Sequence, residues 1–464
     1  MSYSSKIEEL IELLSQESGL NTESNHKYLK NLQHGFHKLN YAHEYLKDSP
    51  TFNKILEEQK IRKSNKDSDK WRKKGTEYIQ LQKHMDAFEC LTKSIAFAEN
   101  ENSSEAFAAR AKLLCDTGYF SACLQDIDRG SKKQCSKTVQ ESLANLKEKA
   151  TKYEIPDHLV DFDPLPVITD RNSTRRSASS YIELRTDETV GRHIIAAKEI
   201  PAGEILVVEK SFVHTMFPES KYLHCHECLK LCYNLIPCPQ CADALYCSDN
   251  CKQQAESYHK YECDVSDLYG ELTINFIKMV VKALDDNSST GPEEYYYKSR
   301  FTDIATLVTN EEKRNGINLY YPIMMATIGF HDLKRKTTIL SDFNISENDL
   351  KNLIYECIMI DSINSFNIKK FSPVDGSAKM IALGIYAFSS LFNHSCTPNC
   401  QYFFHGRNIV IRTTSNIEKG DECNITYCGN YSPHPMKTVE ERRNYLEDVF
   451  FFKCHCKACV GVGN

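Results

Sequence analysis

Eight candidate metal ligands are crowded into 39 residues near the middle of the chain, between Cys225 and Cys263. They form four pairs: Cys225 with Cys228, Cys238 with Cys241, Cys247 with Cys251, and His259 with Cys263. Four thiolate or imidazole ligands close one tetrahedral zinc site, so eight predict two structural zinc ions with no open position. The spacing alone leaves open whether consecutive or alternating pairs share an ion. So small a module has little core without metal, and we expect zinc to fold it.

A second cluster of cysteines follows the spacing C-x-C-x2-C: Cys454, Cys456 and Cys459. Three thiolates leave a tetrahedral zinc one ligand short, and the isolated Cys396 in residues 391–400 is the natural fourth. Such a site would bring residues 454–459 over Asn393 and roof a pocket there. The alternative is a purely structural staple of four cysteines without a pocket.

Composition sets wider bounds. A chain of 464 residues predicts two to four domains, and 41% hydrophobic with 26% charged residues is ordinary for globular proteins. The net charge of −6 excludes a general attraction to nucleic acid or membranes. We expect neither a signal peptide nor a membrane span, and hence a soluble protein of the cytoplasm and nucleus.

The chain carries twenty cysteines, too many to leave unexplained. Close pairs in an intracellular protein indicate metal sites, whereas disulfide frameworks belong to short secreted chains. Eleven of the twenty fall into the ligand spacings above. The other nine, such as Cys90 and Cys357, are expected to be small buried hydrophobic residues.

Two motifs resemble known families. The run Asn-His-Ser-Cys-x-Pro-Asn at 393–399, with the three later cysteines, resembles the SET-domain lysine methyltransferases. Residues 225–263, with Tyr246-Cys247-Ser248 and the final His-x3-Cys, resemble a MYND finger. Together they resemble the SET and MYND domain-containing methyltransferases over about 181–459. Helical repeats before them make the chain most similar to the tetratricopeptide-bearing branch.

The resemblance implies how the finger ligands are shared. Its pairs would interleave, with Cys225, Cys228, Cys247 and Cys251 on one ion and Cys238, Cys241, His259 and Cys263 on the other. Counting the site of Cys396, Cys454, Cys456 and Cys459, three zinc ions are implied. His224, His226 and Cys232 are spare residues that resemble ligands.

The predicted fold class is α+β and multidomain: helical repeats, then a β-rich SET domain with an inserted finger and helical insert, and a zinc-binding tail. The expected segments are N-terminal helices (1–69), repeats (70–150), a linker (151–180), the first SET part (181–221), the finger (225–263), the helical insert (265–360), the second SET part (361–430) and the post-SET tail (431–464).

Residues 70–135 predict two helix-turn-helix repeats. Gly75 to Ala109 spans 34 positions and Ala87 to Ala122 spans 35, close to the tetratricopeptide period of about 34. Such repeats need about three units to close a core, so we expect the N-terminal helices to cap them. The repeats form either a peptide-binding groove or a helical brace.

The segment after Tyr181 predicts β-structure. Residues 194–197, a turn at Gly203 and residues 205–209 predict a hairpin, and residues 409–412 and 424–429 predict further strands. A Gly-containing loop at 190–192 matches the opening of SET domains. The family usually has glycine where His193 stands.

The resemblance implies a chemistry. Transfer of a methyl group from S-adenosylmethionine to an amine is an in-line displacement that needs alignment and a neutral lysine. Tyr427 is the candidate catalytic residue, its hydroxyl aimed at the reacting centre. The implied cofactor-binding residues are Val190, Gly191, Arg192, Asn393, His394, Tyr427 and Phe452.

Two functions remain open from the sequence. The first is a lysine methyltransferase acting on a histone or non-histone protein; the second is a catalytically silent scaffold that recruits partners. Tyr427, Asn393 and the three cysteines of the tail favour the first. His193 favours the second, as does the sequence stopping five residues past Cys459, where smaller members carry a helical domain. Expected partners are a substrate lysine and peptides bound by finger and repeats, without direct nucleic-acid binding.

Overall fold

The computed structural model describes residues 5–57, 63–153, 164–265, 275–286, 301–371, 378–428 and 438–460. The chain forms two compact units, each built from separate stretches. One unit comprises Met1–Glu58, Leu165–Thr215 and Leu268–Asn464, and the other Gln59–Pro164 and Met216–Asp267. Residues 154–163, about a third of the predicted linker, lie outside the described residues. Within the described ranges, no helix is long and apolar enough to cross a membrane.

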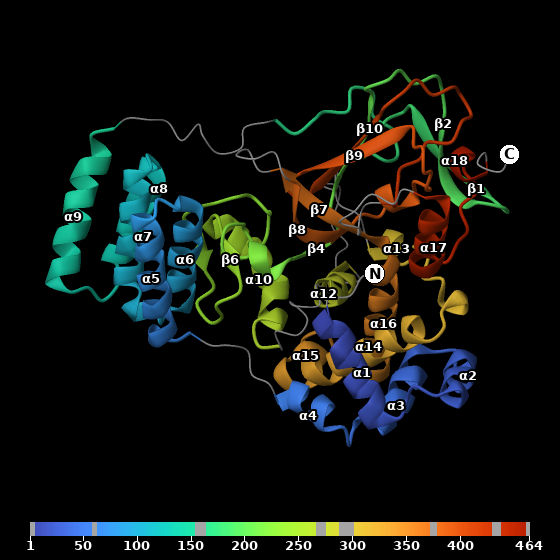
Figure 1. The fold of residues 1–464 in the computed structure, drawn as a ribbon, viewed down its shortest axis with the longest axis horizontal. Coiled ribbons are helices and arrows are strands. Elements are labelled where there is room, and N and C mark those ends of the chain that lie inside the picture. The colour runs from blue at the N-terminus through green and yellow to red at the C-terminus, as the bar shows by residue number, and fades with distance from the viewer. Residues whose placement is uncertain are drawn as a thin grey trace. The chain divides into compact units, whose positions relative to one another are not determined.

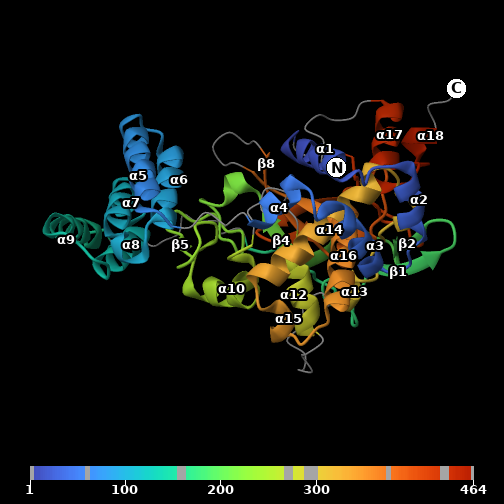
Figure 2. The same cartoon turned by 90° about the horizontal axis from the view of Figure 1, so that it is seen from below.

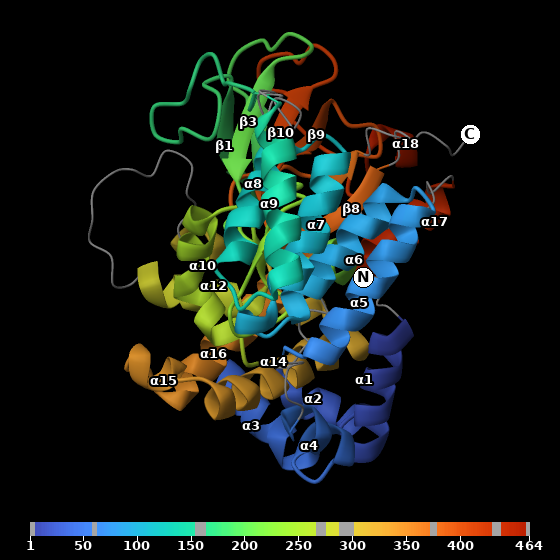
Figure 3. The same ribbon diagram turned by 90° about the vertical axis from the view of Figure 1, so that its left-hand side faces the viewer.

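Five helices of the second unit lie side by side (Figure 3). They are α5 (Asn65–Gln80), α6 (His84–Phe97), α7 (Ser104–Asp116), α8 (Phe120–Ser131) and α9 (Lys137–Thr151). The pairs α5–α6 and α7–α8 are the two predicted helix-turn-helix units. Gly75 allows the first pair to pack closely, because a Cβ there would lie 2.8 Å from Leu91. The tetratricopeptide class of these pairs stays a prediction.

The finger belongs to the same unit as the repeats. It contains β5 (Ile236–Pro237), β6 (Leu245–Tyr246) and α10 (Asp249–Glu262). Its Tyr233 ring stacks on Phe88 of α6 with centroids 4.6 Å apart. Arg110 of α7, fully buried, donates to the Leu235 carbonyl at 3.0 Å and binds Asp126 of α8 with two hydrogen bonds. Finger and repeats therefore share one core, and the finger supplies a carbonyl to the buried ion pair of the repeats.

The N-terminal helices are in the first unit, so the expectation that they cap the repeats is wrong. They are α1 (Ser5–Ser18), α2 (Glu23–Asn31), α3 (Gly35–Leu46) and α4 (Pro50–Glu57). Figures 1 and 2 show them beside α14 (Ile317–Lys336) and α16 (Glu347–Asn364), which α3 contacts. Polar contacts fix this packing, such as Phe36 N–H to Asn352 at 2.8 Å. The repeats are instead covered by α9, whose Leu143 and Ala150 enter their core.

The helical insert is confirmed over its described residues. Besides α14 and α16 it contains α12 (Phe276–Asp286), α13 (Phe301–Ile304) and α15 (Ile339–Asp342). α14 is apolar on nearly all sides and buried through most of its length, as expected of a central helix. α16 runs directly into the first strand that follows it, so the insert ends at the edge of the sheets.

The strands form small sheets, and the pairs β1–β2, β3–β10, β9–β10 and β7–β8 are antiparallel. A two-stranded sheet pairs β1 (Ile182–Asp187) with β2 (Gly191–Ala196), and three-stranded sheets follow the orders β3-β10-β9 and β4-β8-β7. These strands are β3 (Ile205–Lys210), β4 (Val213–Met216), β7 (Ser365–Phe371), β8 (Ala378–Ile385), β9 (Cys400–His405) and β10 (Asn408–Thr413). Two further helices, α17 (Val439–Phe450) and α18 (Lys457–Val460), follow; Cys454 and Cys456 lie between them, and Cys459 lies in α18.

Two strand predictions differ from the structure. The predicted hairpin is wrong, because β2 pairs with β1 while β3 pairs with β10. The chain after β2 contacts residues distant in the sequence, including the end of β10, where Gly203 N–H donates to the Thr413 carbonyl at 3.0 Å. Residues 424–428 form no regular strand, only isolated bridges such as His394 with Ile425, and Gly429 lies outside the described residues.

Candidate active site and metal centres

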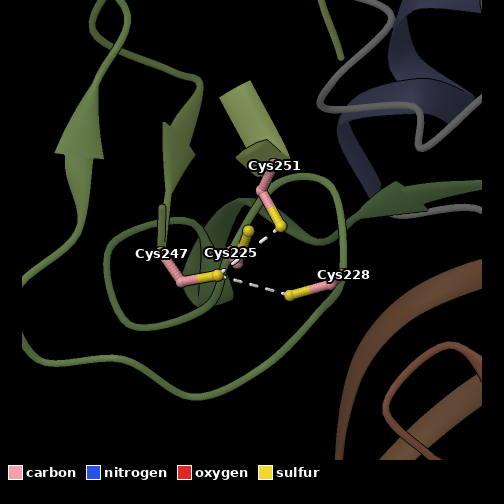
Figure 4. Close-up of side chains that lie close together, drawn as sticks. All are labelled: Cys225, Cys228, Cys247 and Cys251. Carbon is pink, nitrogen blue, oxygen red and sulfur yellow. Dashed lines mark hydrogen bonds between the residues drawn. The ribbon is translucent and has the colours of Figure 1, made fainter. Parts of the chain in front are cut away.

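The first finger cluster brings together Cys225, Cys228, Cys247 and Cys251 (Figure 4). Their sulfur atoms all lie within 4.8 Å of one another. The Cys247 sulfur is 3.6 Å from those of Cys228 and Cys251. Pairs distant in the sequence thus share one centre, as the interleaved pattern requires. Four thiolates at these separations suit a tetrahedral zinc ion.

The second finger cluster contains Cys238, Cys241, His259 and Cys263, all buried. His259 Nε2 lies 3.5 Å from the Cys241 sulfur. On its other side, His259 Nδ1 lies 3.5 Å from Glu262. A carboxylate behind a histidine favours the tautomer that turns its lone pair toward a metal. Three thiolates and one imidazole again suit zinc.

The spare residues of the finger lie outside these two sets. His224 Nδ1 is 3.3 Å from the Ser220 carbonyl, and the Cys232 sulfur is 3.1 Å from Asn234. His226 is 3.3 Å from Glu262. Each of these three side chains makes a polar contact with a residue of the protein and is not one of the four ligands of either set.

The third cluster joins Cys396 to Cys454, Cys456 and Cys459, again with all sulfur atoms within 4.8 Å. Cys396 Sγ is 3.5 Å from Cys459 Sγ and 3.9 Å from Cys454 Sγ. The packing around it includes the buried Leu446 of α17. The tail therefore returns to residues 391–400, and its donor set suits a third zinc ion.

Beside this cluster lies a cavity of about 1190 Å³. Its wall combines segments far apart in the sequence: the loop before β2, the end of α16, residues 390–399, residues 421–427 and the tail. All seven predicted cofactor-binding residues line it, namely Val190, Gly191, Arg192, Asn393, His394, Tyr427 and Phe452. The structure thus brings together residues that the sequence separates by more than two hundred positions.

The loop at 189–192 is held from both sides. Asp187 accepts hydrogen bonds from the Thr189 and Val190 N–H groups at 2.6 and 3.2 Å. Gly191 has φ +71°, a backbone conformation that other residues rarely adopt. The Arg192 guanidinium donates to Thr306 Oγ1 at 2.9 Å and also to the Thr306 carbonyl.

His193 does not line the cavity in the part of the chain that the structure describes. Its Nδ1 lies 3.0 Å from the Gly191 carbonyl, and it pairs with Arg185 across the β1–β2 sheet. The histidine that replaces the family's usual glycine is therefore not part of the cavity wall, which is formed here by residues 189–192.

Asn393 connects two walls of the cavity. Its amide donates to Glu422 at 2.9 Å and, more weakly, to the Val190 carbonyl at 3.5 Å. The main chain on either side is fixed by Ile425 N–H to the Asn393 carbonyl at 3.0 Å and Ser395 N–H to the Ile425 carbonyl at 2.9 Å. The loop and residues 391–400 are thus held together by polar groups.

Tyr427 lies where these elements meet. Its hydroxyl donates to the Phe392 carbonyl at 2.7 Å, and its N–H donates to His394 Nδ1 at 2.9 Å. Its ring centroid is 4.9 Å from that of Phe450. Burial raises the pKa of Tyr427, and the Glu422 carboxylate adds to the shift. The phenol therefore remains protonated near neutral pH.

The structure adds lining residues that sequence reasoning did not assign to the site: Asn310, Asn364, Phe366, Glu422 and Phe450. Asn310 has φ +48° and donates to the Phe450 carbonyl at 3.1 Å. Asn364 donates to the Val308 carbonyl at 2.9 Å. Two sequence elements contain three of them: Asn-Ser-Phe at 364–366 holds Asn364 and Phe366, and Gly-Asp-Glu at 420–422 holds Glu422. Nothing in the local pattern of Phe450 distinguishes it from a packing residue of α17.

Comparison with known proteins gives a match to the SET domain family over residues 191–428, just over half of the chain. A relative from Mus musculus, protein-lysine N-methyltransferase SMYD4, is 24% identical over 84% of this chain and 66% of its own length. Mouse histone-lysine N-methyltransferase SMYD3 is 27% identical over 60% of this chain and 61% of its own length. A Dictyostelium discoideum SET and MYND domain-containing protein, DDB_G0273589, is 25% identical over 61% of this chain and 82% of its own length.

The chain spans less than two thirds of the length of the two mouse relatives. The SET match encloses the finger, and its last residues include Tyr427. The three cysteine clusters lie where MYND and post-SET zinc sites are expected. Its cysteine clusters and its relatives are those of the SET and MYND branch of the SET-domain family. The chain therefore belongs to this family.

Proposed function

We propose that the protein is an S-adenosylmethionine-dependent protein-lysine N-methyltransferase. The observation that carries the proposal is the cavity of about 1190 Å³, lined by all seven residues that the family resemblance assigns to the cofactor. Small-molecule sites enclose roughly 300–1,000 Å³, so this volume accommodates a nucleoside cofactor and an entering side chain. Two of the relatives are lysine N-methyltransferases by name, which supports the same reaction class.

The residues present fit the cofactor. Main-chain groups of 190–192 and the Asn393 amide offer hydrogen bonds, and the Phe452 ring offers a flat apolar surface for a purine. Charges of both signs line the cavity, including Arg192 and Glu422, as a zwitterionic amino acid group requires. When bound, S-adenosylmethionine supplies an activated methyl group on a sulfonium.

The chain's own residues prepare the lysine. Aromatic rings of Phe366, Tyr427 and Phe450 line the cavity, and apolar surroundings disfavour a charged ammonium. A lysine amine is therefore shifted toward the neutral form that can attack. The protonated Tyr427 hydroxyl supplies a fixed dipole, and its bonds to Phe392 and His394 hold it in place.

Three zinc ions are part of the proposal: two in the finger and one at Cys396, Cys454, Cys456 and Cys459. All three have four protein ligands, so each is structural rather than catalytic. Peptide binding through the finger or the repeats stays a prediction, as does the identity of the substrate protein.

The test is transfer of labelled methyl groups to a broad protein pool, comparing wild type with Tyr427→Phe at equal zinc content. Loss of one preorganised hydroxyl should lower the transfer rate by roughly 10²-fold while cofactor affinity stays within a few-fold. Tyr445→Phe is the matched control, because the Tyr445 hydroxyl is buried and has no hydrogen-bond partner among the described residues. That variant should transfer at the wild-type rate.

The competing function is a catalytically silent scaffold. Absence of transfer by the zinc-loaded wild type, together with absence of cofactor binding, would favour it. The sequence argument for a spoiled cofactor loop rested on His193, which is not among the residues that line the cavity where the structure describes it.

A further inference from the structure

His394 has a ring that contacts two functionally different groups. Its Nδ1 accepts the N–H of Tyr427 at 2.9 Å, and its Nε2 lies 3.2 Å from the sulfur of Cys396. One contact leads to the candidate catalytic residue and the other to a candidate zinc ligand. The ring is half-buried between them, and its centroid lies 5.3 Å from the Tyr427 ring.

The hydrogen bond from Tyr427 fixes the tautomer. A main-chain N–H can only donate, so Nδ1 must present its lone pair and a neutral imidazole then carries its hydrogen on Nε2. That hydrogen faces Cys396, so the sulfur is the acceptor, as a metal-bound thiolate would be. The chain of donors therefore runs from Tyr427 through His394 to Cys396.

The same tautomer argues against a different assignment. His394, Cys396 and Cys428 offer three donor atoms within 4.8 Å of one another and resemble part of a further metal site. An Nε2 that carries hydrogen has no lone pair for a metal, and freeing it would break the bond to Tyr427. His394 is thus a neighbour of the metal centre and not a ligand.

Both ends of this bridge are otherwise well fixed. The His394 main chain forms a parallel bridge with Ile425, two residues before Tyr427. The Cys396 and Cys459 thiols raise the pKa of Arg442 of α17, so a cationic side chain lies close to this cluster. Four thiolates around one zinc carry a net charge of −2, which such a neighbour stabilises.

We infer that His394 is a positioning residue whose imidazole couples occupancy of the Cys396–Cys454–Cys456–Cys459 metal site to the main-chain position of Tyr427. This inference rests on the proposed function for its consequence in catalysis. The coupling itself does not require cofactor or substrate to be bound. Metal binding charges the Cys396 sulfur, strengthens its bond with Nε2–H and thereby fixes the ring that holds the Tyr427 N–H.

Three substitutions separate the two halves of the bridge. In His394→Asn the amide oxygen replaces Nδ1 and keeps the Tyr427 bond, but no donor reaches Cys396. In His394→Gln the amide nitrogen replaces Nε2 and keeps the Cys396 bond without an acceptor for Tyr427. His394→Phe removes both while keeping a ring of similar size.

The first measurement is zinc affinity by chelator competition on the full chain. One of the three zinc ions should bind 10- to 100-fold more weakly in the Phe and Asn variants and within about threefold of wild type in the Gln variant. The two finger ions are the internal control for folding. Equal affinities in all four proteins would overturn the inference. So would a fourth metal in wild type that the Gln variant lacks.

The second measurement is hydrogen exchange of the segment that contains the Tyr427 amide. We expect fast exchange in the Phe and Gln variants and wild-type protection in the Asn variant. Chelating the weakest zinc should speed Tyr427 exchange in wild type but not in the Asn variant, where the link to Cys396 is missing. Equal acceleration in both would overturn the coupling. Neither measurement needs cofactor or substrate, so a catalytically silent protein would leave both results unchanged.

Discussion

The finger and the tail use the same chemistry for different ends. Eight finger ligands come from 39 consecutive residues, and among the described residues none of the finger lines the cavity. The tail cluster instead joins Cys396 to cysteines 58 and 63 positions later, and its neighbours line the cavity wall. The finger's second cluster is wholly buried, whereas two of the four tail cysteines are half-exposed.

The difference shows that ligand number does not reveal what a zinc site is for. A local cluster replaces a missing core, so its loss unfolds one small module. A non-local cluster closes a loop and places one part of the chain on another, so its loss opens a cavity without removing the elements around it. The following predictions test this contrast.

The largest effect is expected from Cys238→Ser. Zinc contributes on the order of 10 kcal/mol to the folding of such modules, so zinc should fall from three per chain to two and the finger should become protease-sensitive. Cofactor binding should persist, because the cavity is in the other unit. Metal analysis, limited proteolysis and calorimetry measure these effects. Cys232→Ser is the control, and loss of cofactor binding in Cys238→Ser would contradict the contrast.

Asp126→Ala should cost about 3–5 kcal/mol of unfolding free energy, because it leaves the fully buried Arg110 charge unpaired. Arg129 also binds Asp126 and donates to the finger's Asn234 carbonyl at 2.8 Å. The finger should therefore lose protease resistance along with the repeats. Urea unfolding measures the change. Asp128→Ala, which breaks an exposed pair with Lys132, should cost less than about 1 kcal/mol.

Cys456→Ser should remove one zinc ion and weaken cofactor binding by about 10- to 100-fold, while the finger keeps its two ions. The reason is that the tail supplies Phe452 and Cys454 to the cavity wall. Calorimetry with the cofactor and zinc analysis test this. Cys428→Ser removes a thiol that packs against the same cluster without belonging to it, and should leave both values near wild type.

The smallest effect concerns the N-terminal helices of the first unit. His43 of α3 stacks on His331 of α14 with centroids 4.1 Å apart, and burial, with His43 and Lys351 adding, lowers the pKa of His331 to about 4. The Lys334 charge also lowers the pKa of His331, whereas the Glu347 carboxylate raises it. The unfolded state, with a histidine pKa near 6.5, takes up the proton first. Stability should thus fall between pH 6.5 and 4.

The loss is roughly 1–2 kcal/mol for a partly exposed ring, and His331→Phe should remove it. Unfolding curves of both proteins across this pH range supply the comparison. Parallel pH profiles for wild type and His331→Phe would show that His331 does not carry the dependence.

Ligand spacing was the strongest predictor of both fold and site. The sequence placed all twelve candidate metal ligands, and the structure groups them in three sets of four. Such motifs are short-range in sequence and strict in geometry, so few alternatives fit them. The seven cofactor candidates came from the family resemblance, and they line one cavity.

Predictions that depended on long-range packing did less well. The sequence predicted helices at 1–69 but not their partner, because an apolar helix face fits α14 and α16 as well as it would fit a repeat. The hairpin around Gly203 failed for the same reason: Thr413, more than two hundred positions away, supplies the hydrogen bonds. Phe450 looks like any apolar residue of an amphipathic helix until the tail is placed.

The 58 positions between Cys396 and Cys454 also set an order of events during synthesis. Ribosomes add roughly 5–20 residues per second, so about 3–12 s separate the first ligand of this site from the second. The finger's ligands span 38 positions, about 2–8 s at the same rate, and all eight are made before Cys396, so they can take up metal while the chain is growing. Residues 391–400 must wait for the tail, so zinc can close the cavity wall only after the finger's ligands are complete.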